Sequence, residues 1–600
     1  MKHIIVALIT AFTFIQSSSA QKDFLKVWTN DGKCKTYPIT NIDSITFITE
    51  CLEVYFPTQN KNFFTSSNDA TVNIIAARRN PQDAIEVALS AKTNKPENFI
   101  IPEKIIFKQG EARSKIKIQI KEAAEGNTYN AKLGLENTNH ASPYAKDANE
   151  INFSLTRLTE KTVNELKLTF YCKNTAEAQA LELKIPDLKF NKSLVVSVTC
   201  DDILASQFGI IHNAINNKKI SYKTDIHAAQ YLADDFPDDI SEGLGYPLTY
   251  TDGCGNMRRF SVTLAISPNK NTIYGTHMEK EINIGAEHQY RFTYPYLVWD
   301  DVNEMIKFGS SIGQHDIDDN RYDLNDIIAI QQGFRDDRNK AFEKTGRKMK
   351  MMIQPNGDKN YTKAFETYHN YYHDVSEHYE TEIIPSLRPT ILQKIKSFRD
   401  FNESESTFGR YTDLVDQEML KNANERKWLH FGIHRGYYQK SNGYSFDANF
   451  VNVLDYYYKT YGSAGNDSIW VANMDEFYEY IYMRDNATIN KNVNGTCVEF
   501  TIELPIESNF YYPEISFVTN GNYTSCDIPQ NATGFSISKD KKLINVNFST
   551  NLPRLAAEFV ERYEKKKDEN TKIDAIYFTS QLKAGEFKNI LQKRVNAVTP

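Results

Sequence analysis

The sequence predicts a multidomain protein with an N-terminal β-sandwich, a (β/α) barrel and a C-terminal α+β region. Its 600 residues allow three or four domains, at about 100–200 residues per domain. Strand-like patterns recur through residues 52–158 with few helix signals, and from residue 193 apolar runs of strand length alternate with helical stretches. Strand patterns then return after residue 493. We therefore place the sandwich at 51–158, the barrel at 159–490 and the α+β region at 491–600.

The first 20 residues are expected to be a secretory signal peptide. A start that contains Lys2 precedes an apolar run at residues 4–15 and small residues up to Ala20, where we expect cleavage. The run is shorter than the ~20 residues that span a bilayer, and no later stretch reaches that length. We therefore expect export to the periplasm, the cell surface or the medium, with no transmembrane segment in the mature chain.

Residues 21–50 are expected to form a short β-hairpin module with an Asp31-Gly32 turn. The stretch DGKCKTYPITNIDSITF resembles the strand module that opens many secreted Bacteroidetes proteins. Further along, strand-length segments follow one another at the spacing of a sandwich. One of them, FIIPEKIIFKQGEARSKIKIQI, resembles Calx-beta-like domains of bacterial surface proteins. Because it carries no dense acidic cluster, we interpret the region 51–158 as a spacer or interaction module.

The region 159–490 alternates near-continuous apolar strands with helices, which is typical of a parallel sheet covered on both faces. The apolar runs lie at residues 193–199, 260–265, 310–313, 349–353, 428–433 and 469–472. Helical stretches are expected at 297–308, 325–345, 361–376 and 447–461. We expect a barrel of fewer than eight regular strands, followed by helices at 553–565 and 577–594.

Charge and cysteine content argue against two kinds of site. With 70 Lys and Arg against 77 Asp and Glu, the formal net charge is −7, so the chain lacks the basic footprint that nucleic acid binding needs. The seven cysteines are widely spaced and none belongs to a CxxC pair, which makes a structural zinc site improbable. An exported chain permits disulfides, and Cys34–Cys51 and Cys497–Cys526 are the plausible pairs.

Three apolar runs of the expected barrel end in residues that can ligate a metal or transfer a proton. Asp201 and Asp202 follow the first run, His315 follows the third, and His434 follows the run at 428–433. Active sites of such barrels lie at the carboxyl ends of the strands. Adjacent ionised carboxylates repel each other, and a metal or a shared proton resolves that repulsion. Asp319 lies four residues after His315, so one helical turn would put both on one face, as a divalent-metal site requires.

Five stretches occur in a characteristic order: SLVVSVTCDD, WDDVNEMIKFGSSIGQHDIDD, GRKMKMMIQPNGDKNY, WLHFGIHR and DSIWVANMDEFYEYI. They resemble the five motif regions of polysaccharide deacetylases, the NodB-homology or carbohydrate esterase family 4 group. The resemblance covers roughly residues 185–485, about half of the chain. It implies a deacetylase-type barrel and metal-assisted hydrolysis of acetyl groups on a glycan substrate, with zinc, manganese, magnesium or iron as the divalent metal.

Each motif residue acquires an expected role from this resemblance. Asp201 is the general base, and His434 is the general acid that protonates the leaving amine or alkoxide. The expected metal ligands are Asp202, His315 and Asp319.

Substrate contacts are expected from two turns. Pro355 and Asn356 stand in the third motif, and Asp252 and Asn256 stand in the turn YTDGCGN, opposite the first motif. These four residues could form the rim that contacts the glycan.

The chain also departs from the family pattern. The third motif lacks its arginine, Asp319 stands where the second motif has a histidine, and Ile203 stands where a glycine is usual. The last motif lacks the leucine that would line an acetyl pocket. These departures favour an alternative function, in which a degenerate barrel serves a non-catalytic glycan-binding or surface-assembly protein. The metal content of the purified protein discriminates between the two.

Overall fold

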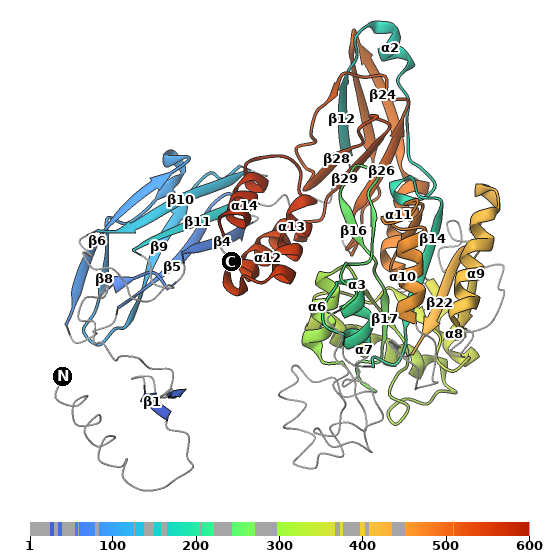
Figure 1. Ribbon diagram of the computed structural model, residues 1–600, viewed down its shortest axis with the longest axis horizontal. Coiled ribbons are helices and arrows are strands. Elements are labelled where there is room, and N and C mark those ends of the chain that lie inside the picture. Colours follow the sequence, from blue (N-terminus) through green and yellow to red (C-terminus); the bar gives the residue numbers. More distant parts are fainter. Residues whose placement is uncertain are drawn as a thin grey trace. The chain divides into compact units, whose positions relative to one another are not determined.

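The computed structural model divides the chain into two compact units (Figure 1). The first consists of Met1–Phe63, Asp69–Glu122 and Tyr129–Ser154, and the second contains Leu155–Pro600 with two short segments, Phe64–Asn68 and Ala123–Thr128. The described residues are 24–28, 34–38, 54–57, 59–65, 67–78, 83–124, 127–136, 149–157, 165–204, 207–220, 243–270, 297–366, 373–375, 397–401, 407–434, 450–507 and 509–598. The expected signal peptide and Cys51 lie outside them.

The first unit contains a hairpin and two further sheets. β1 (Phe24–Trp28) and β2 (Cys34–Pro38) pair antiparallel, and the Asp31-Gly32 turn expected between them lies outside the described residues. The sheets have the strand orders β4-β11-β10-β6-β8 and β3-β5-β9-β7. Their strands are β3 (Val54–Tyr55), β4 (Asn60–Thr65), β5 (Ala70–Arg78), β6 (Ile85–Thr93), β7 (Phe99–Ile100), β8 (Lys104–Phe107), β9 (Arg113–Ile120), β10 (Thr128–Leu135) and β11 (Glu150–Arg157).

Side chains of these sheets alternate between buried and exposed. β5 and β9 pair antiparallel, with Ile74 opposite Ile116, and both of these side chains are buried. Successive side chains of a strand point to opposite faces, so one face of this sheet forms the core of the unit. The strand-rich character expected of residues 51–158 is therefore confirmed.

The centre of the second unit is a parallel sheet of eight strands, whereas the sequence predicted fewer than eight. Its order is β20-β19-β18-β17-β14-β22-β21, and β23 pairs additionally with β14. The path ends at β20 and β21, and no pairing joins these two strands in the described part of the chain. The strands are β14 (Leu194–Cys200), β17 (Thr263–Ile266), β18 (Ser311–Gln314), β19 (Met351–Ile353), β20 (His373–Val375), β21 (Ser397–Phe401), β22 (Trp428–Ile433) and β23 (Ile469–Val471).

Every residue of β14 and β22 is buried, as expected for strands that are covered on both faces. One edge of β14 pairs with β22 from Val196 onward. The other edge is shared, because its first residues, Leu194 to Val196, pair with β23 and its last two, Thr199 and Cys200, pair with β17. β23 therefore lies between β14 and β17 at the amino ends of these strands.

Helices alternate with these strands along the chain (Figure 1). The longest, α7, begins after Asp326, whose carboxylate accepts a hydrogen bond from Ile328 N at 2.9 Å, and ends at Gly346, which has φ of 70°. The helices are α2 (Thr175–Ala180), α3 (Asn213–Ile215), α6 (Trp299–Lys307), α7 (Ile327–Thr345), α8 (Lys359–Glu366), α9 (Thr407–Leu420), α10 (Phe450–Thr460) and α11 (Met474–Asn486). In the described residues, no helix has both the length and the apolar character that crossing a membrane requires.

Two more sheets combine strands from before and after the parallel sheet. Their orders are β24-β25-β12-β27 and β13-β26-β29-β28, and Glu165 of β12 lies opposite Glu503 of β25. The strands are β12 (Glu165–Tyr171), β13 (Leu183–Lys184), β24 (Thr488–Asn494), β25 (Cys497–Glu503), β26 (Glu514–Thr519), β27 (Ser525–Cys526), β28 (Gly534–Ile537) and β29 (Leu543–Asn547). The stretch 165–184 thus belongs with the C-terminal strands rather than with the parallel sheet.

This pairing contradicts the expected Cys497–Cys526 disulfide, because both cysteines are free. Cys497 lies opposite Tyr171 and Cys526 lies opposite Phe170, on the two different edges of β12. Two strand spacings amount to about 9.6 Å. That separation exceeds the reach of a disulfide bond.

The chain ends in three helices, where two were expected. They are α12 (Asn551–Lys566), α13 (Glu569–Ser580) and α14 (Glu586–Ala597). Their apolar side chains form a separate small core, which also includes Phe308 from the end of α6. This core attaches the C-terminal helices to the amino-end side of the parallel sheet.

Candidate active site

The candidate site begins where β14 ends, at Asp201 and Asp202. Asp201 is 1% exposed, and its backbone N–H donates to Ile433 O at 2.8 Å. Asp202 and Ile203 then have φ of 66° and 49°, in the left-handed region. A β-branched residue seldom adopts this conformation, and such strain concentrates at functional sites. The turn leaves Ile203 buried while the Asp202 side chain is 51% exposed at the carboxyl end of the strand.

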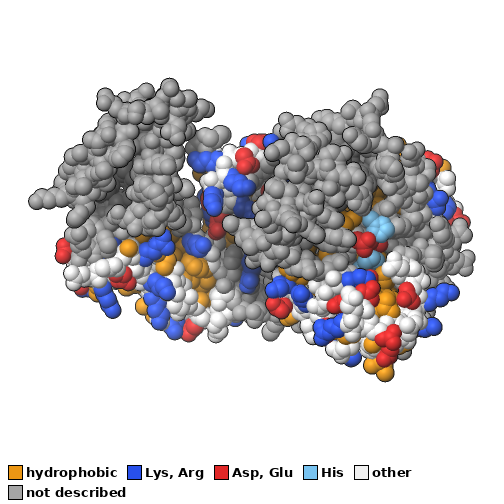
Figure 2. Space-filling view, turned by 90° about the horizontal axis from the view of Figure 1, so that it is seen from below, with side chains coloured by type: hydrophobic (Ala, Val, Ile, Leu, Met, Phe, Trp, Pro, Cys, Tyr) orange, Lys and Arg blue, Asp and Glu red, His pale blue; other side chains and the backbone are white. Residues whose placement is uncertain are grey.

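Two histidines from other strands meet the Asp202 carboxylate. His315 Nε2 lies 3.5 Å from Asp202 Oδ1, and His434 Nε2 lies 3.5 Å from Asp202 Oδ2. The His315 ring is oriented by its other nitrogen, because Nδ1 lies 2.9 Å from Ile353 O, to which it donates. Figure 2 shows histidine and acidic side chains grouped on one face of the molecule. The structure therefore brings Asp202, His315 and His434 together.

The charges in this group are strongly coupled. Burial lowers the pKa of His315, but the contact with Asp202 and the negative charges of Asp201 and Asp202 outweigh burial and raise it to about 9. The same contact lowers the pKa of Asp202, although burial opposes this. At neutral pH in the absence of a metal, His315 and Asp202 therefore form an ion pair.

Gln207, which sequence reasoning missed, connects β14, which precedes Asp202, to β22, which precedes His434. Its fully buried Nε2 donates to Asp201 O at 2.5 Å and to His434 O at 3.0 Å. It thereby fixes the end of β14 against the end of β22. Its only sequence signal is a polar residue in the apolar stretch QFGII.

A buried carboxylate, Asp337 of α7, anchors the loops after β17 and β18. It accepts hydrogen bonds from Asn269 N at 3.0 Å, Asn269 Nδ2 at 2.5 Å and Gln314 Nε2 at 2.8 Å. Burial raises the pKa of Asp337 to about 7 despite these donors. Because Gln314 directly precedes His315, Asp337 helps to position the histidine without contacting it.

Asp319 does not join the group, contrary to expectation. A four-residue spacing aligns side chains only in a helix, and residues 315–318 are not helical. Instead the Asp319 carboxylate lies 3.3 Å from Lys270 Nζ, and Lys270 also pairs with Asp316. Among the described residues, no three His, Cys, Asp or Glu side chains are grouped closely enough to hold a metal ion.

Pro355 and Asn356 follow β19, next to Ile353, whose carbonyl orients His315. Pro355 is buried, and Asn356 is exposed with φ of 52°. The structure therefore places this turn beside the group at the carboxyl ends of the strands.

Asp252 and Asn256 lie elsewhere, in the hairpin of β15 (Thr249–Thr251) and β16 (Met257–Arg259). Asp252 is fully buried and accepts from Cys254 N at 2.9 Å, Asn256 N at 3.0 Å and Asn256 Nδ2 at 2.8 Å. The hairpin leads into the amino end of β17, at the opposite end of the sheet from Asp202. These contacts correct the expected substrate role, because both side chains are used to hold their own turn.

Two side chains at the carboxyl ends of the strands, His315 and Asp202, have atoms that can ligate a divalent cation. The Nδ1 hydrogen bond of His315 leaves Nε2 as the ligating atom, which is the usual arrangement of metal-binding histidines. Asp202 offers exposed carboxylate oxygens beside it. Asp319 does not complete the set, since its carboxylate is paired with Lys270.

We expect Asp319→Asn to leave zinc affinity within about twofold of the unchanged protein, because Asp319 contacts Lys270 and not the two donors. His315→Ala should weaken binding at least about tenfold, since it removes a donor atom. Calorimetric zinc titration of both variants provides the measurement. A loss of zinc in Asp319→Asn as large as that in His315→Ala would contradict the placement of Asp319.

A family model described as "Putative polysaccharide deacetylase" matches residues 167–596. The matched span begins within β12 and ends within α14, so it includes the parallel sheet, both adjoining sheets and the C-terminal helices. No curated protein matches the chain.

Similarities to solved structures are weak. The calcium-binding domain CBD12 of CALX1.1 is 10% identical, with 20% of this chain covering 65% of that one and a TM-score of 0.15. The ASH/PapD-like domain of human CEP192 is 10% identical over 20% of this chain and 94% of that one, with a TM-score of 0.14. A Bacteroides ovatus GH5 xyloglucanase is 11% identical over 53% and 60%, with a TM-score of 0.13. Such TM-scores do not establish a shared fold.

Proposed function

The chain belongs to the family described as "Putative polysaccharide deacetylase", and from this premise we propose that it hydrolyses acetyl groups from a glycan. The observation that carries the proposal is the position of Asp202 between His315 and His434. The three residues follow β14, β18 and β22, so they share the carboxyl ends of one parallel sheet. In both barrels and open parallel sheets, the active site lies at the carboxyl ends of the strands.

Four side chains divide the proposed reaction. His434, which is 32% exposed, protonates the leaving amine or alkoxide. Asp201, next to Asp202 at the end of β14, accepts the proton of the attacking water. Asp202 and His315 would hold the divalent ion, whether zinc, manganese, magnesium or iron. When bound, this ion would polarise the acetyl carbonyl and lower the pKa of water. The left-handed turn at Asp202 and Ile203 separates Asp201 from the ligand that follows it.

A screen for released acetate tests this proposal. Purified protein is incubated with N-acetylated glucosamine oligomers, peptidoglycan and acetylated xylan, before and after dialysis against a chelator. We expect acetate from at least one of the substrates, and loss of that activity on chelation with recovery on adding one of the four metals. Absence of acetate from all of them under every metal would contradict the assignment. The substrate that releases acetate shows whether the protein prefers N-acetyl or O-acetyl groups.

A second candidate function is non-catalytic glycan binding by a degenerate site. The pairing of Lys270 with Asp316 and Asp319 favours this function, because the Lys270 ammonium group occupies the Asp319 carboxylate that was expected to bind the metal. In this case the same glycans bind in an affinity assay, while no acetate is released and no metal copurifies. The two candidates therefore give opposite results in the acetate screen.

We also propose export, which rests on the apolar run and small residues of the first 20 positions. A glycan substrate of the cell envelope agrees with that location.

A further inference from the structure

A cavity of about 130 Å³ lies within the second unit, at the amino ends of the parallel strands and far from Asp202 in the fold. The hairpin β15–β16, the strands β26 and β29 and the helices α12 and α13 contribute to its walls. Its charged lining residues are Lys189, Arg258, Arg259, Lys307, Arg347, Glu476 and Glu514. Five cations thus surround the cavity against two carboxylates.

The carboxylates of the lining are already engaged. Glu514 accepts from Arg258 at 2.5 Å and lies 2.9 Å from Lys189, which also lies 2.8 Å from Glu476. Arg259 pairs with Asp574 at 2.7 Å, outside the lining. Each of these buried cations therefore has a partner, and one acid serves two of them.

Lys307 pairs with Glu558 at 2.8 Å, which leaves Arg347 as the one lining cation without a carboxylate partner among the described residues. Its Nη1 donates to Tyr512 Oη at 2.7 Å, and its guanidinium lies 4.9 Å from the ring centre of Tyr511. In the part of the chain that the structure describes, no carboxylate lies within ion-pair distance of Arg347. It is half-buried, so a ligand in the cavity can reach its remaining donors without unfolding the wall.

Two further donors are unsatisfied beside the cavity. Arg258 and Arg259 are 8% and 4% exposed, and in the described residues neither Nε–H finds an acceptor. Leaving a buried donor without a partner is energetically unfavourable.

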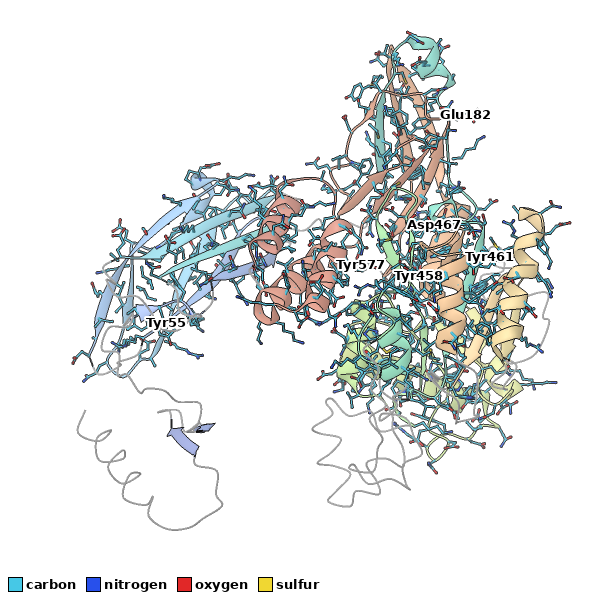
Figure 3. The ribbon with its side chains drawn as sticks, viewed as in Figure 1. Tyr55, Glu182, Tyr458, Tyr461, Asp467 and Tyr577 are labelled. Atoms are coloured by element: carbon cyan, nitrogen blue, oxygen red, sulfur yellow. The ribbon has the colours of Figure 1, made fainter. Side chains whose placement is uncertain are left out.

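Aromatic rings form much of the remaining wall. They include Tyr577 of α13, which Figure 3 labels and whose ring lies 4.4 Å from the Arg259 guanidinium. Other aromatic residues of the lining are Phe190, Tyr250, Phe308, Tyr511, Tyr512 and Phe578. The cavity has room for roughly ten water molecules, and therefore for a compact ligand the size of one sugar ring.

We propose that this cavity binds an acidic monosaccharide, in which a carboxylate or phosphate pairs with Arg347 and the ring packs on the tyrosines. Arg347, which has no carboxylate within ion-pair distance among the described residues, and the unsatisfied guanidinium donors of Arg258 and Arg259 select the anion. The aromatic walls select a ring over a free inorganic ion. The site is separate from the rim at Asp202 and does not depend on acetyl hydrolysis.

Calorimetry and thermal unfolding of the full chain test this proposal with four probes. Glucuronate and glucose 6-phosphate distinguish the carboxylate from the phosphate source, while glucose and inorganic phosphate each present one half of the ligand. We expect at least one sugar acid to bind and raise the unfolding temperature, with binding at least tenfold tighter than for glucose or phosphate. Sodium chloride at equal ionic strength should not reproduce the shift.

Arg347→Gln should weaken the sugar acid at least tenfold, because it removes the unpaired charge while keeping a side chain of similar length. Arg335→Gln is the matched control, since Arg335 is exposed on α7 and donates to Gln332 Oε1 of the same helix at 3.1 Å. Arg347→Lys keeps the charge and should retain part of the affinity if Arg347→Gln unfolds. Three results would overturn the proposal. They are that Arg347→Gln binds the sugar acid as tightly as the unchanged protein, that inorganic phosphate binds as tightly as the sugar acids, or that none of the four probes binds.

Discussion

Asp201→Asn is expected to lower the turnover number for acetate release by about 10³-fold while the protein keeps its metal. General bases typically contribute about 10²–10⁴-fold to the rate. Asparagine has the shape of aspartate but cannot accept the proton of the attacking water. Asp201 is buried at the end of β14, and its backbone contacts with Ile433 and Gln207 do not involve the carboxylate. The substitution should therefore leave the strand end in place.

His315→Ala is the comparison that separates the base from the metal ligands. It should lose both the metal and the activity, because its Nε2 faces Asp202 and is a proposed donor atom. Acetate release and elemental analysis of both variants, prepared in parallel, give the measurement. Equal metal loss in Asp201→Asn and His315→Ala would contradict the assigned roles.

The metal-free protein should lose stability as the pH rises from about 6.5 to about 9. The pKa of His315 is about 9 in the folded chain and about 6.5 when the chain unfolds, so the folded state holds more protons in this interval. The slope of the unfolding free energy with pH is then negative. The contribution of the His315–Asp202 pair is complete below pH 6.5 and is lost as the pH passes through 9. Its size is on the order of 3 kcal/mol.

Urea unfolding in the presence of a chelator at pH 6, 7.5 and 9 measures this loss. Tryptophan fluorescence is a suitable signal, because Trp299, Trp428 and Trp470 all lie buried in the second unit. In His315→Gln the decline over this interval should largely disappear, since glutamine does not titrate. If the variant declines as steeply as the unchanged protein, His315 is not the group responsible.

The parallel strands and the residues at their carboxyl ends could be predicted from the sequence, because each of them has a local sequence pattern. The apolar runs at 193–199 and 428–433 match the buried strands β14 and β22 to within one residue, since covered parallel strands are apolar throughout. Polar residues directly after such runs must lie at the carboxyl ends, and the meeting of Asp202, His315 and His434 follows.

The remaining features depend on geometry that no local pattern contains. The role expected for Asp319 assumed a helical turn, and the chain there is irregular. The turn at Asp252 has the composition of a rim loop, but composition does not tell which end of a strand a hairpin adjoins. Gln207 acts through backbone carbonyls of two distant strands, and only the folded arrangement identifies them.

The arrangement of β12 and β23 constrains the order in which the chain can fold during synthesis. β14 lacks half of one edge until residues 469–471 have been made, and β12 lacks its partner until residues 497–503 follow. Contacts of such large sequence separation form late and slowly. A nascent chain that ends before β25 therefore carries an unpaired β12 edge, which could pair wrongly with another chain. Shortened versions that stop after the parallel sheet should aggregate, because β12 would lack its partner β25.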